Sequence, residues 1–277
     1  MALRIITADE RLAEANLKTT AVIVGPSGSG KTTLMKTLPA ATTLCLDLEA
    51  GLKSVQDWRG DSIPVRTFED ALDIACLIGG INPAADENAF FSEAHYRHLA
   101  AAHPDLVELI ASKRTIFVDS ITDLTRQAMA WAKTRPEAFS EKTGNPDTRG
   151  AYGLLAREVI GLLKHLQHAE GKTVIFVGIL ERVTDDMGRV TWQPQMEGGK
   201  AARELPGIVD QVITMGLFAR DGDGWRHEPE RGEHRRLVCR AGNGFALPAK
   251  DRSGRLDVTE PPDLGALLAK INATSKG

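Results

Sequence analysis

The sequence predicts an α/β domain built on a mostly parallel sheet with helices on both faces. Four apolar runs with the length of buried strands alternate along the chain with segments of helical character, at residues 20–24, 42–48, 113–119 and 173–180. The chain has 277 residues, of which 42% are hydrophobic and 26% charged. This length and composition suffice for one large core, so we expect a single domain over residues 1–277.

Helices and further strands are expected between and after these runs. The long helix before the fourth run is the clearest, because leucines and a valine recur at helical spacing from Leu155 to Leu166 and Gly171 offers a C-terminal cap. Residues 79–104 combine Gly-Gly and Asn-Pro turns with a polar helix, which is typical of an insertion at the edge of the core. The other expected elements are helices at 31–38, 68–78, 122–133, 200–205 and 264–271, a hairpin-like loop around residues 186–188, and strands at 64–66, 208–217 and 236–240, with residues 226–277 as a C-terminal extension.

The cysteines and the charge balance narrow the class of protein. Cys45, Cys76 and Cys239 form no C-x-x-C pair, so the expected compartment is the reducing cytoplasm, without a zinc site or a disulfide framework. No apolar run approaches the roughly 20 residues that span a bilayer, and we expect no membrane partner. The net charge of −3 gives no global attraction to nucleic acid, so any such binding depends on local basic loops.

A glycine-rich motif follows the first predicted strand. Residues 25–32 read GPSGSGKT and lead into the first predicted helix, which is the setting of a P-loop. The glycines let backbone N–H groups surround a triphosphate, Lys31 can reach the β- and γ-phosphates, and the Thr32 hydroxyl can hold Mg²⁺. The predicted nucleotide contacts are Gly25, Pro26, Ser27, Gly28, Ser29, Gly30, Lys31, Thr32 and Thr33.

Acidic residues at two other strand ends complete the site that a P-loop ATPase needs for ATP and Mg²⁺. Asp119 ends the third apolar run and is predicted to hold Mg²⁺ together with Thr32. A plain helix N-cap is the alternative role for Asp119, although Ser120 could cap the helix instead. Glu49 stands just past the second run and is the predicted acid that activates the attacking water. Asp47, two residues earlier, is the alternative.

These motifs, in this order, resemble the RecA-like ATPases. The resemblance rests on the P-loop, on the acid-ended segment Asp47-Leu-Glu49-Ala-Gly51, on IFVDSIT at 116–122 and on a glycine-bearing loop before the long helix; it covers about residues 20–260. The chain looks most similar to the short phage-encoded ATP-binding proteins of that group, which are linked to single-strand annealing and homologous recombination. The resemblance implies DNA-stimulated ATP hydrolysis by a ring or filament of identical subunits on single-stranded DNA, in the cytoplasm of a bacterial or prophage-bearing cell. It also implies a single-strand DNA-binding protein among the partners.

RecA-like proteins hold single-stranded DNA on two mobile loops, which the resemblance puts at residues 141–152 and 182–203. Each segment combines cations for phosphates with an aromatic side chain that can stack on a base. The predicted DNA contacts are Lys142, Arg149, Tyr152, Arg189, Trp192 and Lys200. Ordinary solvated loops are the alternative. At the end of the fourth run, Glu181 or Arg182 stands where the family usually has a Gln or His sensor, which departs from the family pattern.

The C-terminal extension carries a Lys-x-Arg pair, Lys250 and Arg252. The pair resembles the cations that RecA-like subunits project into a neighbour's ATP site, where they would stabilise charge on the γ-phosphate. Exposed loop charges without a function are the alternative. The sequence indicates no other cation that would do this work in cis, and the four arginines between residues 231 and 240, interspersed with glutamates, are expected to form a mixed solvated surface.

Two other functions fit the same motifs. A small-molecule kinase would use Asp47 and Glu49 to bind its acceptor, although the chain has no Arg-rich lid between the later strands. A nucleotide-gated binding module with little turnover applies if Glu49 does not face the γ-phosphate. A GTPase is disfavoured because no N-K-x-D stretch for guanine occurs.

Overall fold

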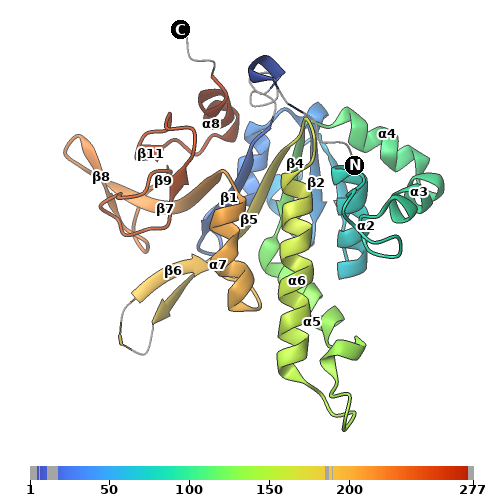
Figure 1. The fold of residues 1–277 in the computed structure, drawn as a ribbon. Coiled ribbons are helices and arrows are strands. Elements are labelled where there is room, and N and C mark those ends of the chain that lie inside the picture. The colour runs from blue at the N-terminus through green and yellow to red at the C-terminus, as the bar shows by residue number, and fades with distance from the viewer. Residues whose placement is uncertain (1–4, 6, 11–17, 185–186, 189, 274–277) are drawn as a thin grey trace.

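A mostly parallel β-sheet forms the centre of the computed structural model, which describes residues 5, 7–10, 18–184, 187–188 and 190–273 (Figure 1). The strands β3, β2, β4, β5, β1 and β7 lie side by side in this order and are parallel. Their bounds, in the same order, are Asp61–Pro64, Thr43–Asp47, Thr115–Asp119, Thr173–Thr184, Thr20–Gly25 and Gln211–Asp221. The α/β class predicted from the sequence is confirmed.

Helices cover both faces of this sheet, because successive residues of a strand point to opposite sides. In β1, Val22 and Val24 pack on one side and Ile23 packs on the other. The first side is covered by α2 (Phe68–Gly79), α5 (Ile121–Ala132), α6 (Thr148–Gln167) and α7 (Gly199–Ile208). The second side is covered by the 3-10 helices η1 (Thr32–Thr37) and η3 (Leu52–Val55) and by α8 (Leu264–Ile271). The strands read as continuous apolar runs because both of their faces are buried.

Antiparallel strands extend the sheet beyond β7. The strand β9 (His234–Val238) pairs with β7, and β11 (Thr259–Glu260) pairs with β9. Two shorter strands, β8 (Gly224–His227) and β10 (Lys250–Asp251), also pair with β7, one near each of its ends. The described part of the C-terminal extension therefore continues the central sheet.

Several elements differ from the sequence expectation, and the short strand expected at residues 64–66 is observed at Asp61–Pro64. The helix after the P-loop begins at Thr32 and is a 3-10 helix. In the insertion, the predicted helix α3 (Glu93–Ala102) is followed by an unpredicted helix, α4 (Pro104–Ser112), whose first residue is a proline, as is common at helix starts. The strand β5 continues past residue 180 and pairs with β6 (Val190–Pro194), so the hairpin-like loop expected around residues 186–188 is flanked by two paired strands. The remaining 3-10 turns are η2 (Ala40–Thr42) and η4 (Pro136–Ala138).

Parallel pairing brings the chemically important strand ends to one edge of the sheet. The P-loop follows β1, Asp47 and Asp119 end β2 and β4, and these two aspartates are register partners. The connection between α5 and α6 and the β5–β6 hairpin both project at the bottom of Figure 1, beyond the same edge. Nucleotide-binding and projecting segments therefore share one side of the molecule.

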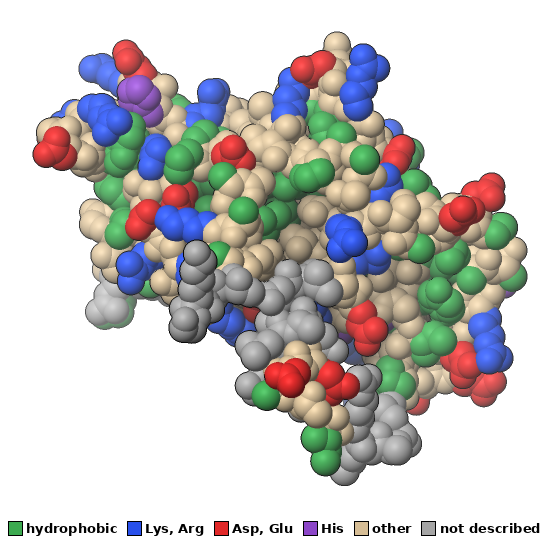
Figure 2. Space-filling view, turned by 90° about the horizontal axis from the view of Figure 1, so that it is seen from above, with side chains coloured by type: hydrophobic (Ala, Val, Ile, Leu, Met, Phe, Trp, Pro, Cys, Tyr) green, Lys and Arg blue, Asp and Glu red, His purple; other side chains and the backbone are tan. Residues whose placement is uncertain are grey.

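The opposite side has a mixed surface. Seen from above, Lys, Arg, Asp and Glu side chains are interspersed, and they do not gather in a patch of one sign (Figure 2). None of the described helices has the length and apolarity needed to cross a membrane.

Candidate nucleotide-binding site

The P-loop has the backbone shape that its glycines allow. Gly28 and Gly30 adopt φ of 75° and 99°, in the left-handed region that side chains rarely enter. Gly25 has no room for a side chain, because a Cβ there would lie 2.5 Å from the carbonyl oxygen of Met215 on the neighbouring strand β7. The motif therefore folds as a tight loop between β1 and η1.

Two polar groups inside this loop are suited to phosphate. The ammonium of Lys31 donates to the carbonyl oxygens of Gly25 and Pro26, at 3.0 and 2.9 Å, and its partial burial lowers its pKa against the opposing effect of Glu49 and Asp119. The hydroxyl of Ser29 is 5% exposed and has no hydrogen-bond partner within the described part of the chain. An orphaned buried hydroxyl costs about 1–3 kcal/mol, and a phosphate oxygen is the partner that such a loop is built to receive. The residues present fit a bound triphosphate.

Thr32 and Asp119 form the predicted metal position. The Thr32 hydroxyl donates to a carboxylate oxygen of Asp119 at 2.7 Å, across the sheet edge from η1 to β4. Asp119 is 2% exposed, and this burial raises its pKa to about 6, with Glu49 and Asp47 adding to the rise and Thr32 and Lys31 opposing it. One hydroxyl and one carboxylate are ligands that Mg²⁺ takes when phosphates and waters fill its other positions. The described residues gather no cluster of three or more His, Cys or acidic side chains that would hold an ion alone.

The two candidate water-activating acids have different surroundings. Asp47 is 9% exposed and accepts a hydrogen bond from the backbone N–H of Gly51 at 3.3 Å. Glu49 is exposed and lies near Lys31, Ser120 and Asp123. Desolvation and the neighbouring Asp123 carboxyl raise the pKa of Glu49. Glu49 is thus the more accessible acid, and its role as the base stays a prediction.

Sequence reasoning missed Asp123. Ser120 caps α5: its hydroxyl accepts from the N–H of Asp123 at 3.3 Å and donates to the Asp123 carboxylate at 2.8 Å. Asp123 also pairs with Arg126 at 3.0 Å. The Ser-x-x-Asp spacing at a helix start could have identified this group as a cap partner, but its position near Glu49 depends on the tertiary fold.

Arg235 is a second missed residue; it is exposed, as expected for the mixed surface of the arginines between residues 231 and 240, but it also contacts the P-loop. It lies on β9 and its Nε donates to the carbonyl oxygen of Ser29 at 2.8 Å. A Cβ on Gly30 would lie 3.2 Å from the same nitrogen. The sequence pattern therefore did not reveal that a cation lies beside the P-loop in cis. No local pattern could have found this contact, because 206 positions separate the two partners.

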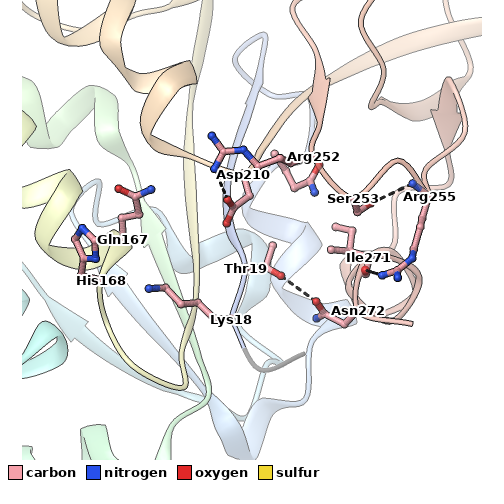
Figure 3. Close-up of a pocket in the computed structure, with 11 residues that line it drawn as sticks. Lys18, Thr19, Gln167, His168, Asp210, Arg252, Ser253, Arg255, Ile271 and Asn272 are labelled. Carbon is pink, nitrogen blue, oxygen red and sulfur yellow. Dashed lines mark hydrogen bonds and ion pairs between the residues drawn. The ribbon is translucent and has the colours of Figure 1, made fainter. Parts of the chain in front are cut away.

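Lys250 and Arg252 lie at the amino-terminal edge of the sheet, away from the P-loop of the same chain. Lys250 faces Val212 near the start of β7 and donates to the carbonyl oxygens of Pro206 and Val209, at 2.6 and 2.7 Å. Arg252 pairs with Asp210 at 2.9 Å and lines a cavity of about 480 Å³ (Figure 3). Within one chain, neither cation can reach the nucleotide.

The predicted DNA contacts have unequal exposure. Lys142, Arg149, Tyr152 and Lys200 are exposed, whereas Trp192 is half-buried and packs against the core opposite Arg182 in the hairpin. Arg189 lies outside the described residues. The segments 141–152 and 182–203 lie side by side, because a Cβ on Gly198 would lie 3.6 Å from the Tyr152 ring. The described part of the second segment is a hairpin followed by α7, in agreement with the turn and the helix expected at residues 186–188 and 200–205.

Comparison with known proteins assigns the chain to a family. A family model described as the AAA domain matches residues 17–253. No curated protein matches the chain. Among solved structures, it is similar to a prototypical ATPase from the type III secretion system of pathogenic bacteria, with 16% identity, a TM-score of 0.38 and coverage of 73% of this chain. The chain spans about half the length of that protein, 54%. Because the family model covers most of the sequence, the P-loop and its neighbouring acids belong to an AAA-family P-loop ATPase domain.

Proposed function

We propose that this chain binds ATP with Mg²⁺, hydrolyses it, and acts on single-stranded DNA in annealing or recombination of the phage type. The observation that carries the hydrolytic part is the meeting of Lys31, Thr32, Asp119 and Glu49 at one edge of the sheet. These side chains come from three different strand ends, and phosphoryl transfer needs positioned charges of these kinds.

Each side chain has a distinct task in this proposal. When ATP binds, the Lys31 ammonium leaves the carbonyl oxygens of Gly25 and Pro26, binds the β- and γ-phosphates and neutralises part of their charge. Thr32 and Asp119 hold Mg²⁺, which when bound neutralises charge that develops on the phosphates. Glu49, which lies near Lys31 and Ser120, accepts the proton of the attacking water.

The DNA part is supported by the direction of the projecting segments. The α5–α6 connection and the β5–β6 hairpin extend from the side that carries the P-loop (Figure 1). Arg149, Tyr152 and Lys200 are exposed there, and the close approach of Tyr152 to Gly198 links the two segments. Cations beside an exposed ring are suited to a single strand, whose phosphates and bases they contact separately.

An oligomer is part of the proposal. Arg252 lies at the edge opposite the P-loop, so it can serve a nucleotide only when a second copy places its P-loop edge against it. A cation supplied by a neighbour in this way can raise the hydrolysis rate by about 10³ or more.

The test is ATP hydrolysis measured alone, with single-stranded DNA and with a panel of nucleosides. We expect hydrolysis to rise with single-stranded DNA and to be lost in Lys31→Ala, because the charge that neutralises the phosphates is removed. Phosphate transfer to a nucleoside would indicate a kinase. Tight ATP binding without turnover in any condition would indicate a nucleotide-gated binding module. Unchanged ATP affinity and rate in Lys31→Ala would contradict the assignment of the site.

A further inference from the structure

A cavity of about 310 Å³ adjoins the P-loop and has no part in the chemistry described above. It lies between η1 on one side and the strands β7 and β9 on the other, and Gly30, Thr33, Met215, Arg235 and Pro262 are among the residues that line it. Its volume is at the lower end of the range of small-molecule pockets. Because Gly30 and Thr33 also belong to the predicted phosphate-binding segment, the cavity opens directly beside the phosphates.

The layout of the sheet indicates which end of a nucleotide faces this cavity. In the strand order, β1 and its P-loop have β5, β4 and β2 on one side and β7 and β9 on the other. The acids that act on Mg²⁺ and water, Asp119 and Glu49, come from the β4 and β2 side. The terminal phosphate must lie toward these acids, so the nucleoside leaves the loop in the opposite direction. This direction leads to the cavity on the β7 and β9 side.

The guanidinium of Arg235 lies at the wall of this cavity and is suited to stack on a flat ligand. Its Nε is held by the Ser29 carbonyl oxygen at 2.8 Å, which fixes the guanidinium beside the loop. Within the described chain, its two terminal nitrogens have no hydrogen-bond or ion-pair partner. A fixed guanidinium plane stacks on the face of an aromatic ring and loses little conformational entropy when it does so. The side chain of Met215, which also lines the cavity, adds an apolar wall.

We propose that this cavity binds the base of the nucleotide and that Arg235 stacks on the ring. The inference rests on the proposed binding of a nucleoside triphosphate at the P-loop, and it adds the residues that recognise the nucleoside. Arg235 is then a specificity-determining residue that distinguishes a nucleoside triphosphate from an inorganic polyphosphate. Stacking involves only the face of the ring, so it should increase the affinity for ATP and GTP equally. It does not distinguish the hydrogen-bonding groups at the edges of adenine and guanine.

The test compares the affinities of ATP, GTP and inorganic tripolyphosphate, all with Mg²⁺, for the wild type, Arg235→Ala, Arg235→Lys and Arg231→Ala. We expect Arg235→Ala to weaken ATP and GTP by about tenfold, the size of a cation–π contact, and to leave tripolyphosphate within about twofold. Arg235→Lys keeps the charge but loses the plane, so most of the loss should remain. Arg231→Ala, an exposed arginine four residues earlier, is the matched control and should behave as the wild type.

A second variant tests the cavity without touching the arginine. Thr33 is exposed on the cavity wall, and Thr33→Tyr should narrow the space, weakening ATP more than tripolyphosphate. Equal losses of ATP and tripolyphosphate in Arg235→Ala, full rescue by Arg235→Lys, or unchanged ATP affinity in both Arg235→Ala and Thr33→Tyr would overturn the base site while leaving nucleotide binding intact. A wild type that binds neither ATP nor tripolyphosphate would overturn the proposed function itself, which is a different result.

Discussion

At the scale of single residues, the site concentrates charge where burial opposes it. Asp119 is almost fully buried, and its pKa of about 6 records the cost of keeping a carboxylate in that position. The unfavourable burial of this carboxylate is explained by a bound metal ion, which needs the negative charge of Asp119. Residues that are unfavourable for folding and necessary for ligand binding are typical of functional sites.

We predict that Asp119→Asn stabilises the protein without nucleotide and weakens Mg²⁺-dependent ATP binding. The folded-state pKa of Asp119 is about 6 and lies above the unfolded value near 3.8, so ionisation of Asp119 destabilises the fold as pH rises between these values. The gain in stability should be on the order of 3 kcal/mol at pH 7 and should shrink as pH falls toward 4, where Asp119 is protonated. Urea unfolding across this pH range measures the gain.

Asp86→Asn, which alters an exposed aspartate, is the control for this series. A gain in stability that does not depend on pH, or a loss at pH 7, would contradict the account of Asp119.

We predict that Glu49→Gln keeps ATP binding and slows hydrolysis by about 10² or more, the usual contribution of a general base. The amide retains the shape of the side chain but cannot accept the proton of water. Steady-state phosphate release, with ATP affinity measured separately, distinguishes the two effects. Asp47→Asn is the matched comparison, and if it slows hydrolysis while Glu49→Gln does not, Asp47 is the catalytic acid.

At the scale of elements, a histidine joins the insertion to the core. His165 on α6 is 7% exposed and its ring stacks on Phe91 with centroids 4.1 Å apart. A Cβ on Gly79, at the end of α2, would lie 2.5 Å from Nε2 of the same ring. Burial lowers the pKa of His165 to about 4, and the nearby His168 adds to the effect. This contact therefore depends on an uncharged imidazole.

We predict that acid destabilises the folded protein partly through the His165 imidazole. His165 is protonated below about pH 6.5 in the unfolded chain but only below about pH 4 in the folded protein. The free energy of unfolding therefore falls as pH decreases from 6.5 to 4. His165→Leu should remove part of this fall, while the exposed His98→Leu should not. Thermal unfolding at pH 7 and pH 5 gives the comparison; an equal decrease in Tm for His165→Leu and the wild type would contradict the prediction.

At the scale of the whole molecule, the two ends of the parallel strands carry different groups. The P-loop and acids are at the carboxyl edge, and Lys250 and Arg252 are at the amino edge. The Lys250 ammonium is already bonded to two carbonyl oxygens at the end of α7, so this residue also supports the fold. Arg252 is exposed and has a single surface ion pair, which holds it weakly.

We predict that Arg252 completes hydrolysis in a neighbouring copy. Arg252→Ala and Glu49→Gln should each be impaired, and mixing them should restore part of the turnover, because some interfaces then combine an intact acid with an intact cation. Lys250→Met should mainly lower Tm, since it removes two hydrogen bonds. Phosphate release and size-exclusion chromatography of the mixture are the measurements. Confirmed co-assembly without recovery, or normal hydrolysis by Arg252→Ala, would contradict a shared site.

The sequence by itself determined the strand and helix order, the P-loop with Lys31 and Thr32, and the strand-end acids, because these depend on local patterns of apolar, glycine and acidic residues. The closing helix was predicted with its observed bounds, Leu264–Ile271. Only the tertiary structure decided that Asp123 lies near Glu49, that Arg235 contacts the P-loop and that Lys250 is hydrogen-bonded at the opposite edge of the sheet. The physical reason is that sheet pairing and packing set these contacts between distant segments, and no local pattern encodes which strand lies beside which.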